Sequence, residues 1–186
     1  MLRHLFSSSA APARVVVLGA GGFVGGAIAR HLAGRKIAVL ALRRRDLDLL
    51  APDAGDRLAE MLQPDDAVVM VSAQAPCRTP AMMTANIRMA EAVCEALMRR
   101  PVTHLVYVSS DAVYADSSTP LSEASPAAPG TLHGAMHVAR EQMFASVAGD
   151  VPLAILRPTL IYGPTDPHNG YGPNRFRRLA NRAEPI

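Results

Sequence analysis

A cluster of glycines follows the apolar run Val15–Leu18 near the start of the sequence. Three have the spacing Gly19-x-x-Gly22-x-x-Gly25, and Gly21 fits the more general G-x-G-x-x-G pattern when taken with Gly19. Glycine permits a tight turn and close approach of a ligand to the backbone, and a following helix presents free N–H groups at its N-terminus. An ordinary strand-to-helix turn is the structural alternative. The position directly after an apolar strand favours a site for the diphosphate of a dinucleotide.

Histidines form the second group of residues that could do chemistry. His133 and His137 are four residues apart, which places them on one face of a helix, a spacing that metal sites use. No acidic residue or third histidine is placed beside them as a ligand, so no metal is expected. The remaining histidines are isolated, and we expect packing or surface roles for them: His4, His31, His104 and His168.

Composition limits the possible classes of protein. Hydrophobic residues make up 49% and charged residues 19% of the 186 residues, which is typical of a folded domain with a core. No apolar run reaches the roughly 20 residues of a membrane helix, so no membrane association is expected. Aromatic residues are scarce and the arginines do not form one continuous run, so nucleic acid is not an expected partner. Cys77 and Cys94 lack CxxC or metal-ligand spacing, which indicates a reducing, cytoplasmic location.

Short apolar runs alternate with helical patterns along the chain. Strands are predicted over residues 14–18, 36–42, 67–72, 103–109 and 153–157. Helices are predicted over residues 23–33, 56–62, 80–99 and 132–147. Gly34 should end the first helix, and the uninterrupted run over 67–72 is typical of a strand buried on both faces. The alternation predicts an α/β fold, a doubly wound parallel sheet of the Rossmann type with right-handed crossovers.

Two segments interrupt this alternation, and a third precedes it. Residues 115–130 are rich in Pro and Ser and follow the fourth strand, and residues 163–174 are rich in Gly and Pro and follow the fifth. Ligands bind beyond the carboxyl ends of such strands, so both segments are expected to flank the site. Residues 1–13 are predicted to be a flexible tail, although Arg3, His4 and the serines without any acid give a faint similarity to a mitochondrial leader.

Five motifs in order resemble those of the extended short-chain dehydrogenase/reductase family, the NAD(P)-dependent sugar-nucleotide epimerases, dehydratases and reductases. They are the glycine turn, the pair Asp48-Leu49, Asn86 within 80–99, and the segments 106–114 and 156–164, the last with Arg157-Pro158. Asp46-Leu47 competes with Asp48-Leu49 for the same role. The resemblance implies hydride transfer on a nucleotide sugar or a related carbonyl or hydroxyl compound. It also implies a homodimer formed through the helices 80–99 and 132–147.

The resemblance also implies roles for particular residues. The expected coenzyme contacts are Gly19, Gly22, Phe23, Val24 and Gly25 at the diphosphate, Asp48 and Leu49 at the adenine, and Ala73 and Pro158 elsewhere. Ser110 matches the catalytic Ser/Thr that hydrogen-bonds the substrate. Asp111 stands where dehydratase-like members carry an acid, but Ala112 replaces the Glu that usually follows, which weakens the case for a dehydratase.

The sequence departs from the family at its catalytic Tyr-x-x-x-Lys. His133 stands in place of the Tyr and His137 in place of the Lys. A tyrosine with an ordinary pKa of about 10 needs the Lys charge to act as a base, whereas an imidazole with a pKa of about 6.5 does not. His133 is therefore a candidate acid/base, with His137 holding the nicotinamide ribose. The alternatives are a catalytically degenerate NADP(H)-binding sensor or assembly subunit, and chemistry that recruits Asp111 as the acid.

Coenzyme preference is read at the end of the second predicted strand. NAD-preferring proteins place an acid there for the ribose 2′-hydroxyl. This chain has Arg43, Arg44 and Arg45 with no acid before Asp46. Because arginines pair with a 2′-phosphate that a carboxylate would repel, NADP is favoured over NAD, with Arg43 and Arg44 at the phosphate.

Domain organisation follows from these assignments. Residues 14–174 are predicted to form the NAD(P)-binding domain, and residues 175–186 to begin a truncated substrate-binding portion. Pro185-Ile186 is typical of the start of a strand, which favours a fragment of a longer chain. The sheet is accordingly expected to be incomplete at its C-terminal end.

Overall fold

The computed structural model describes residues 8, 10–149, 151–167 and 172–185, so His4, His168 and most of the predicted tail lie outside the described residues. Five parallel strands form one sheet in the order β2-β1-β3-β4-β5. The strands are β1 (Arg14–Leu18), β2 (Ala38–Leu42), β3 (Asp66–Met70), β4 (His104–Val108) and β5 (Leu153–Leu156). This is one of the two common doubly wound orders, with its topological switch point between β1 and β3. The predicted fold class is confirmed.

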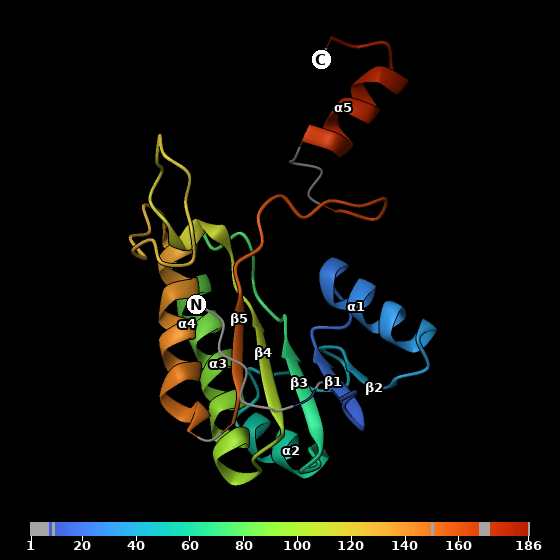
Figure 1. The fold of residues 1–186 in the computed structure, drawn as a ribbon, viewed down its shortest axis with the longest axis vertical. Coiled ribbons are helices and arrows are strands. Elements are labelled where there is room, and N and C mark those ends of the chain that lie inside the picture. The colour runs from blue at the N-terminus through green and yellow to red at the C-terminus, as the bar shows by residue number, and fades with distance from the viewer. Residues whose placement is uncertain (1–7, 9, 150, 168–171, 186) are drawn as a thin grey trace.

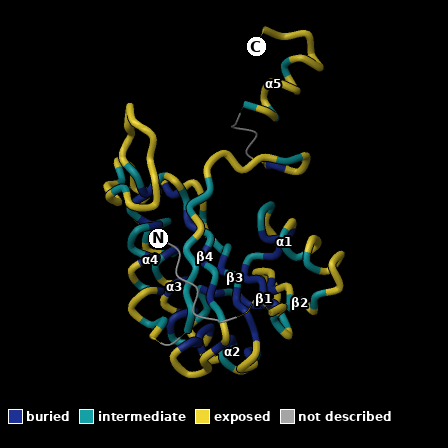
Figure 2. The backbone as a smooth tube through the Cα atoms, in the orientation of Figure 1, coloured by how far each residue is buried: buried dark blue, intermediate teal, exposed yellow. Residues whose placement is uncertain are grey.

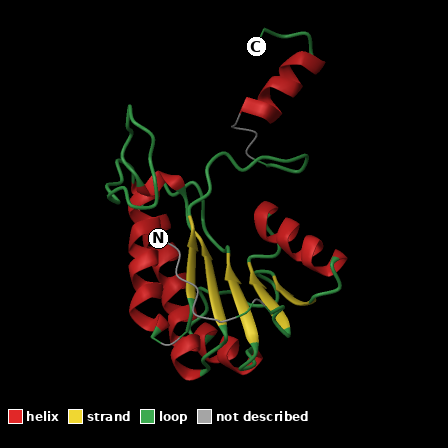
Figure 3. Ribbon diagram, viewed as in Figure 1, coloured by secondary structure: helices red, strands yellow, loops and turns green. Residues whose placement is uncertain are grey.

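Helices cover the sheet from both sides (Figures 1 and 3). Helix α1 (Phe23–Gly34) lies on one face, and α2 (Ala54–Met61), α3 (Pro80–Arg99) and α4 (Leu132–Ala148) lie on the other. A short 3-10 helix, η1 (Asp111–Val113), follows β4, and α5 (Gly172–Asn181) stands apart from the sheet. The sequence analysis predicted the four helices that pack on the sheet but missed η1 and α5.

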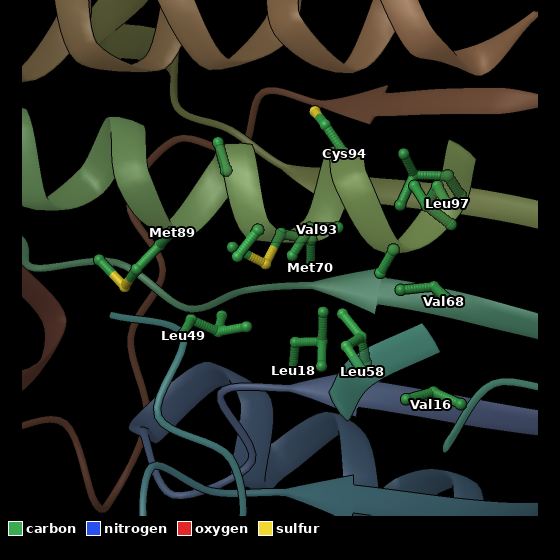
Figure 4. Close-up of a cluster of buried hydrophobic side chains, with 14 of the residues drawn as sticks. Val16, Leu18, Leu49, Leu58, Val68, Met70, Met89, Val93, Cys94 and Leu97 are labelled. Carbon is green, nitrogen blue, oxygen red and sulfur yellow. The ribbon is translucent and has the colours of Figure 1, made fainter. Parts of the chain in front are cut away.

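The core is divided by the sheet into two clusters. Val16 and Leu18 of β1 pack with α2 and α3 in the larger cluster, whereas Val15 and Val17 pack with α1 in the smaller one. Neighbouring side chains of a strand point to opposite faces, so β1 carries both clusters. Figure 4 shows apolar side chains of α3 directed at those of β1 and β3. Figure 2 shows that the buried residues are concentrated around these strands. Consecutive Val and Met residues are typical of strands that are buried on both faces of a parallel sheet.

Element boundaries differ from the prediction where the backbone leaves a regular path. Gly34 belongs to α1, and β2 begins at Ala38 because Lys36 adopts a positive φ of 61° in the connecting turn. Strand β3 ends at Met70, since the N–H groups of Val71 and Ser72 both donate to the carbonyl of Leu18 at 3.0 Å. That shared acceptor bends the chain away from the ladder, at the edge where a ligand would lie.

Candidate functional site

The glycine turn after β1 forms a bare backbone cradle. Gly19 has a φ of +98°, which L side chains rarely adopt, and the N–H of Gly22 donates to its carbonyl at 3.0 Å. A Cβ atom at Gly25 would collide with the same carbonyl oxygen of Gly19. Gly22 is the N-cap of α1 and provides no side-chain cap, so the first N–H groups of the helix remain for a ligand. These features fit an anion held by the backbone, as a diphosphate would be.

A cavity of about 770 Å³ opens above this turn. It is lined by every site residue that the sequence analysis selected: Gly19, Gly22, Phe23, Val24, Gly25, Arg43, Arg44, Asp48, Leu49, Ala73, Ser110, Asp111, His133, His137 and Pro158. Residues that the analysis did not select also line it, among them Ser72, Gln74, Ala75, Met89, Ile161 and Asp166. The segment 163–174 contributes Asp166 and Pro167 to the wall, whereas no residue of 115–130 lines it; that both segments flank a bound ligand stays a prediction.

The residues directly after β2 line the cavity with positively charged side chains. Arg44 donates from Nε to Asp48 Oδ2 at 3.2 Å, and the Leu50 N–H donates to Asp48 Oδ1 at 3.1 Å. These hydrogen bonds, the backbone one first, lower the pKa of Asp48. Arg43 forms no ion pair with any residue that the structure describes, and its side-chain stem passes 3.5 Å from the Cβ position of Gly21. The Arg43 charge is therefore available beside the glycine turn.

Ser110, Asp111 and His133 form the polar side opposite the glycine turn. Ser110 Oγ donates to Asp111 Oδ1 at 3.2 Å and accepts from the Ala112 N–H at 3.2 Å. Gly134, the residue after His133, lies so close to η1 that a Cβ atom there would collide with the carbonyl of Ala112. This backbone contact brings the start of α4, with His133, to the Ser110–Asp111 pair.

The imidazole of His133 is held by the backbone after β3. Its Nδ1 accepts from the Cys77 N–H at 3.3 Å. Thr131 caps α4 by accepting from the Gly134 N–H at 3.1 Å, which fixes the first helical turn. Burial lowers the pKa of His133, and the negative charge of Asp111 only partly opposes this. His133 is therefore neutral at neutral pH.

His137 is buried one helical turn further along α4. Its Nδ1 lies 2.7 Å from the hydroxyl of Tyr107, and its ring meets the His133 ring edge to face at 4.7 Å. Burial raises the pKa of Tyr107 to about 12, so this hydroxyl keeps its proton and is the donor. Burial, together with repulsion from His133 once that ring is protonated and from the Arg140 cation, lowers the pKa of His137 to about 3. His137 is thus a neutral acceptor in the cavity wall, unlike the charged Lys that the resemblance places there.

This neutral burial predicts an acid-sensitive fold. Below an unfolded-state pKa of about 6.5, the unfolded chain binds a proton at His137 that the folded protein does not bind. The free energy of unfolding should therefore fall as the pH decreases from about 6.5 towards about 3, by roughly 1.4 kcal/mol per pH unit for this group. Denaturant titrations at several pH values measure the slope. His137→Asn can still accept a hydrogen bond from Tyr107, and its free energy of unfolding should depend less steeply on pH. Replacement of the exposed His31 by Asn should leave this pH dependence unchanged. Equal slopes in all three proteins would contradict the assignment.

The loop after β3 is fixed by two buried side chains that the sequence analysis gave no such role. Asn86 accepts from the Gln74 N–H at 2.9 Å and donates to the Gln74 carbonyl at 3.0 Å. Arg140 is fully buried, donates from Nη2 to the Ser72 carbonyl at 2.9 Å and lies 5.1 Å from the centre of the Tyr107 ring. Its Nε has no hydrogen-bond partner among the described residues. The cation–π contact with Tyr107 offsets part of the cost of burying this charge. Together they position the Ser72–Ala75 wall of the cavity.

An ion pair between a buried carboxylate and a partly buried guanidinium joins α4 to the end of β5. Arg157 donates from Nη2 to Glu141 Oε2 at 2.7 Å and from Nε to Oε1 at 3.0 Å. Ser109 donates to Glu141 at 2.6 Å, and Arg157 also donates to the Tyr114 hydroxyl at 2.7 Å. These hydrogen bonds, led by those to Glu141, raise the pKa of Arg157. The network ties the strand ends that carry Ser110 and Pro158.

In the described part of the chain, no helix is long and apolar enough to cross a membrane. Among the same residues, no group of three or more His, Cys, Asp or Glu could hold a metal ion.

The sheet, the glycine turn and the position of the cavity define a doubly wound α/β protein of the Rossmann class. Within that class, the model of the NAD dependent epimerase/dehydratase family matches residues 15–184, and the chain belongs to this family. The resemblance found from the motifs is confirmed. No curated protein sequence matches the chain.

Solved structures share the fold over nearly the whole chain. UDP-N-acetylglucosamine 4-epimerase from Bacillus cereus has a TM-score of 0.81 at 22% identity, over 94% of this chain and 64% of that one. UDP-glucose 4-epimerase from Thermus thermophilus, in complex with NAD, has a TM-score of 0.75 at 25% identity, over 93% and 64%. A dTDP-4-dehydrorhamnose reductase from Clostridium acetobutylicum has a TM-score of 0.73 at 18% identity, over 91% and 59%. The chain therefore spans less than two thirds of the length of these structures.

Proposed function

We propose that this chain binds NAD(P)(H) and contributes to hydride transfer on a nucleotide sugar or a related carbonyl or hydroxyl compound. The observation that carries the proposal is a single cavity that joins the bare glycine turn to the Ser110–Asp111–His133 cluster. Membership of an NAD-dependent family and structural neighbours that are nucleotide-sugar enzymes support the same chemistry. Coenzyme bound here would supply the hydride acceptor or donor.

The coenzyme would lie across the switch point between β1 and β3. Backbone N–H groups of the glycine turn and of Phe23, Val24 and Gly25 would hold its diphosphate. Asp48 and Leu49 would contact the adenine, and Ala73 and Pro158 would line its path towards Ser110. Ser110 and His133 would hold the reacting oxygen of the substrate, with His133 at the acid/base position of the family. Residues 14–174 would form the coenzyme-binding domain and residues 175–186 the start of the substrate-binding portion.

We expect NADP(H) to be preferred over NAD(H) because Arg43, beside the glycine turn, forms no ion pair with any of the described residues. Fluorescence titration of the chain with NADPH and with NADH measures both affinities. Arg43→Ala should remove most of the preference, a change of about tenfold for one charge-assisted contact to the 2′-phosphate. Arg35→Ala, which removes an exposed arginine far from the cavity, is the matched control. Failure of both coenzymes to bind the unmodified chain would refute the proposed function.

Assays of turnover on a panel of nucleotide sugars distinguish the enzyme from a second candidate function. That candidate is a catalytically degenerate NADP(H)-binding sensor or assembly subunit, and the replacement of Tyr and Lys by His133 and His137 favours it. Coenzyme binding without hydride exchange on any member of the panel would support the sensor. We further propose a homodimer through α3 and α4, and a reducing, cytoplasmic location consistent with the free Cys77 and Cys94.

A further inference from the structure

The hydrogen bond from the Cys77 N–H determines which nitrogen of His133 carries the proton. A ring nitrogen that accepts a hydrogen bond has no proton of its own, so in the neutral ring the proton lies on Nε2. Protonation of Nδ1 would place two N–H groups against each other at the 3.3 Å contact. The neutral His133 ring is therefore a donor through Nε2 and has no free acceptor nitrogen.

Burial of His133 also disfavours a second proton. His137 of the same helix meets the ring at 4.7 Å, and the buried Arg140 cation lies one turn further along α4. On β4, the Tyr107 hydroxyl is already hydrogen-bonded to His137. Asp111 of η1 supplies the opposing negative charge, but its carboxylate accepts from Ser110 at 3.2 Å. A neutral imidazole near a helix N-terminus that polarises a carbonyl oxygen is a known catalytic arrangement.

We infer that His133 acts as a neutral hydrogen-bond donor to the reacting oxygen of the substrate, and that Ser110 and Asp111 carry the exchanged proton. This inference rests on the proposed function and assigns each of these three residues a role in the reaction. Ser110 Oγ accepts from the Ala112 N–H and donates to Asp111, which leaves one lone pair for a substrate hydroxyl. The substrate oxygen would accept from His133 Nε2–H and donate to Ser110 Oγ.

The proton and electrons balance along this path. In oxidation, the C–H bond breaks and its electron pair leaves as hydride for the nicotinamide of NAD(P)⁺. The O–H bond breaks as the carbonyl bond forms; its proton passes to Ser110 Oγ while the Ser110 proton passes to Asp111. Asp111 is exposed and returns the proton to water. Reduction follows the same path in reverse, and His133 Nε2–H stabilises the negative oxygen in both directions.

Long-range ¹H–¹⁵N NMR of the chain tests the tautomer without requiring activity. We expect the His133 spectrum of an Nε2–H tautomer at neutral pH, with Nδ1 unprotonated. A protonated Nδ1 at neutral pH would overturn the inference even if coenzyme binds as proposed. Conversely, a chain with this tautomer that fails to bind coenzyme would overturn the proposed function instead.

Turnover of variants tests the division of roles. His133→Ala should lose roughly a hundredfold or more in kcat, as expected for an oxyanion donor, whereas His133→Gln, which keeps a neutral N–H donor, should recover at least tenfold of that loss. Asp111→Asn should lower kcat without changing coenzyme affinity, because a neutral amide can accept a hydrogen bond from Ser110 but cannot take up its proton. The kcat profile of the unmodified protein should show no break near pH 6.5. His133→Gln as inactive as His133→Ala, or full activity of Asp111→Asn, would overturn the inference.

Discussion

Gly25→Ala should weaken coenzyme binding by more than tenfold and also destabilise the fold. The added Cβ would collide with the carbonyl oxygen of Gly19, which is backbone and cannot turn away as a flexible side chain could. Relief requires α1 to move away from β1, and this displaces the N–H groups that would hold the diphosphate. Overpacking of this kind costs about 1 to 3 kcal/mol of stability. Fluorescence titration and denaturant unfolding measure the two effects.

Gly34→Ala is the matched control for Gly25→Ala. Gly34 lies in the same helix, and a Cβ atom there meets nothing within 4 Å. Alanine is favoured over glycine within a helix by roughly 0.5 to 1 kcal/mol, so this variant should be at least as stable as the unmodified chain and should bind coenzyme equally well. Unchanged coenzyme affinity in Gly25→Ala would show that the turn after β1 does not hold the diphosphate.

Glu141→Ala should lower the free energy of unfolding by roughly 1.5 to 3 kcal/mol. The substitution leaves the Arg157 guanidinium without its carboxylate in a partly buried position and leaves the Ser109 hydroxyl without its acceptor. Removing one partner of a buried ion pair is costly because the remaining charge stays desolvated. Urea denaturation of purified variants provides the measurement.

An exposed ion pair on the same molecule gives the comparison. Asp56 pairs with Arg99 between α2 and α3, with the two side chains 65% and 50% exposed. Asp56→Ala should cost no more than about 1 kcal/mol, since solvent and salt screen such pairs. Similar losses in Glu141→Ala and Asp56→Ala would mean that the Glu141–Arg157 pair does not stabilise the strand ends.

Much of the fold was predictable because its signals are local. The Val15–Leu18 run, the glycines after it and the long pattern over 80–99 each predict one element, and α3 has the predicted bounds of Pro80–Arg99. Strand ends were less predictable, since β3 stops at Met70 when Val71 and Ser72 donate to Leu18 of another strand. Such a long-range acceptor has no local signal. Helix η1 has only three residues, too few for a periodic pattern.

The candidate site was also predictable only in part. Each predicted site residue lines the cavity because parallel strands place their carboxyl ends at one edge of the sheet. Arg140 and Glu141 resemble ordinary helix-surface charges in the sequence, and only packing shows that both are buried. The partner of Glu141 lies sixteen residues away at the end of β5. The Cys77 donor to His133 was not predictable either, because a backbone N–H is present at every residue except proline.

The main-chain contact between Gly134 and Ala112 has a consequence for how such a site can change over time. The separation of α4 from η1 is set by two backbones, and none of the reacting side chains determines it. Within the proposed function, substitutions at positions 133 and 137 should therefore change the groups that line the cavity while this backbone contact is kept. This contact does not involve the side chains at positions 133 and 137, so it does not depend on whether they are imidazoles or the Tyr and Lys of the resembled motif.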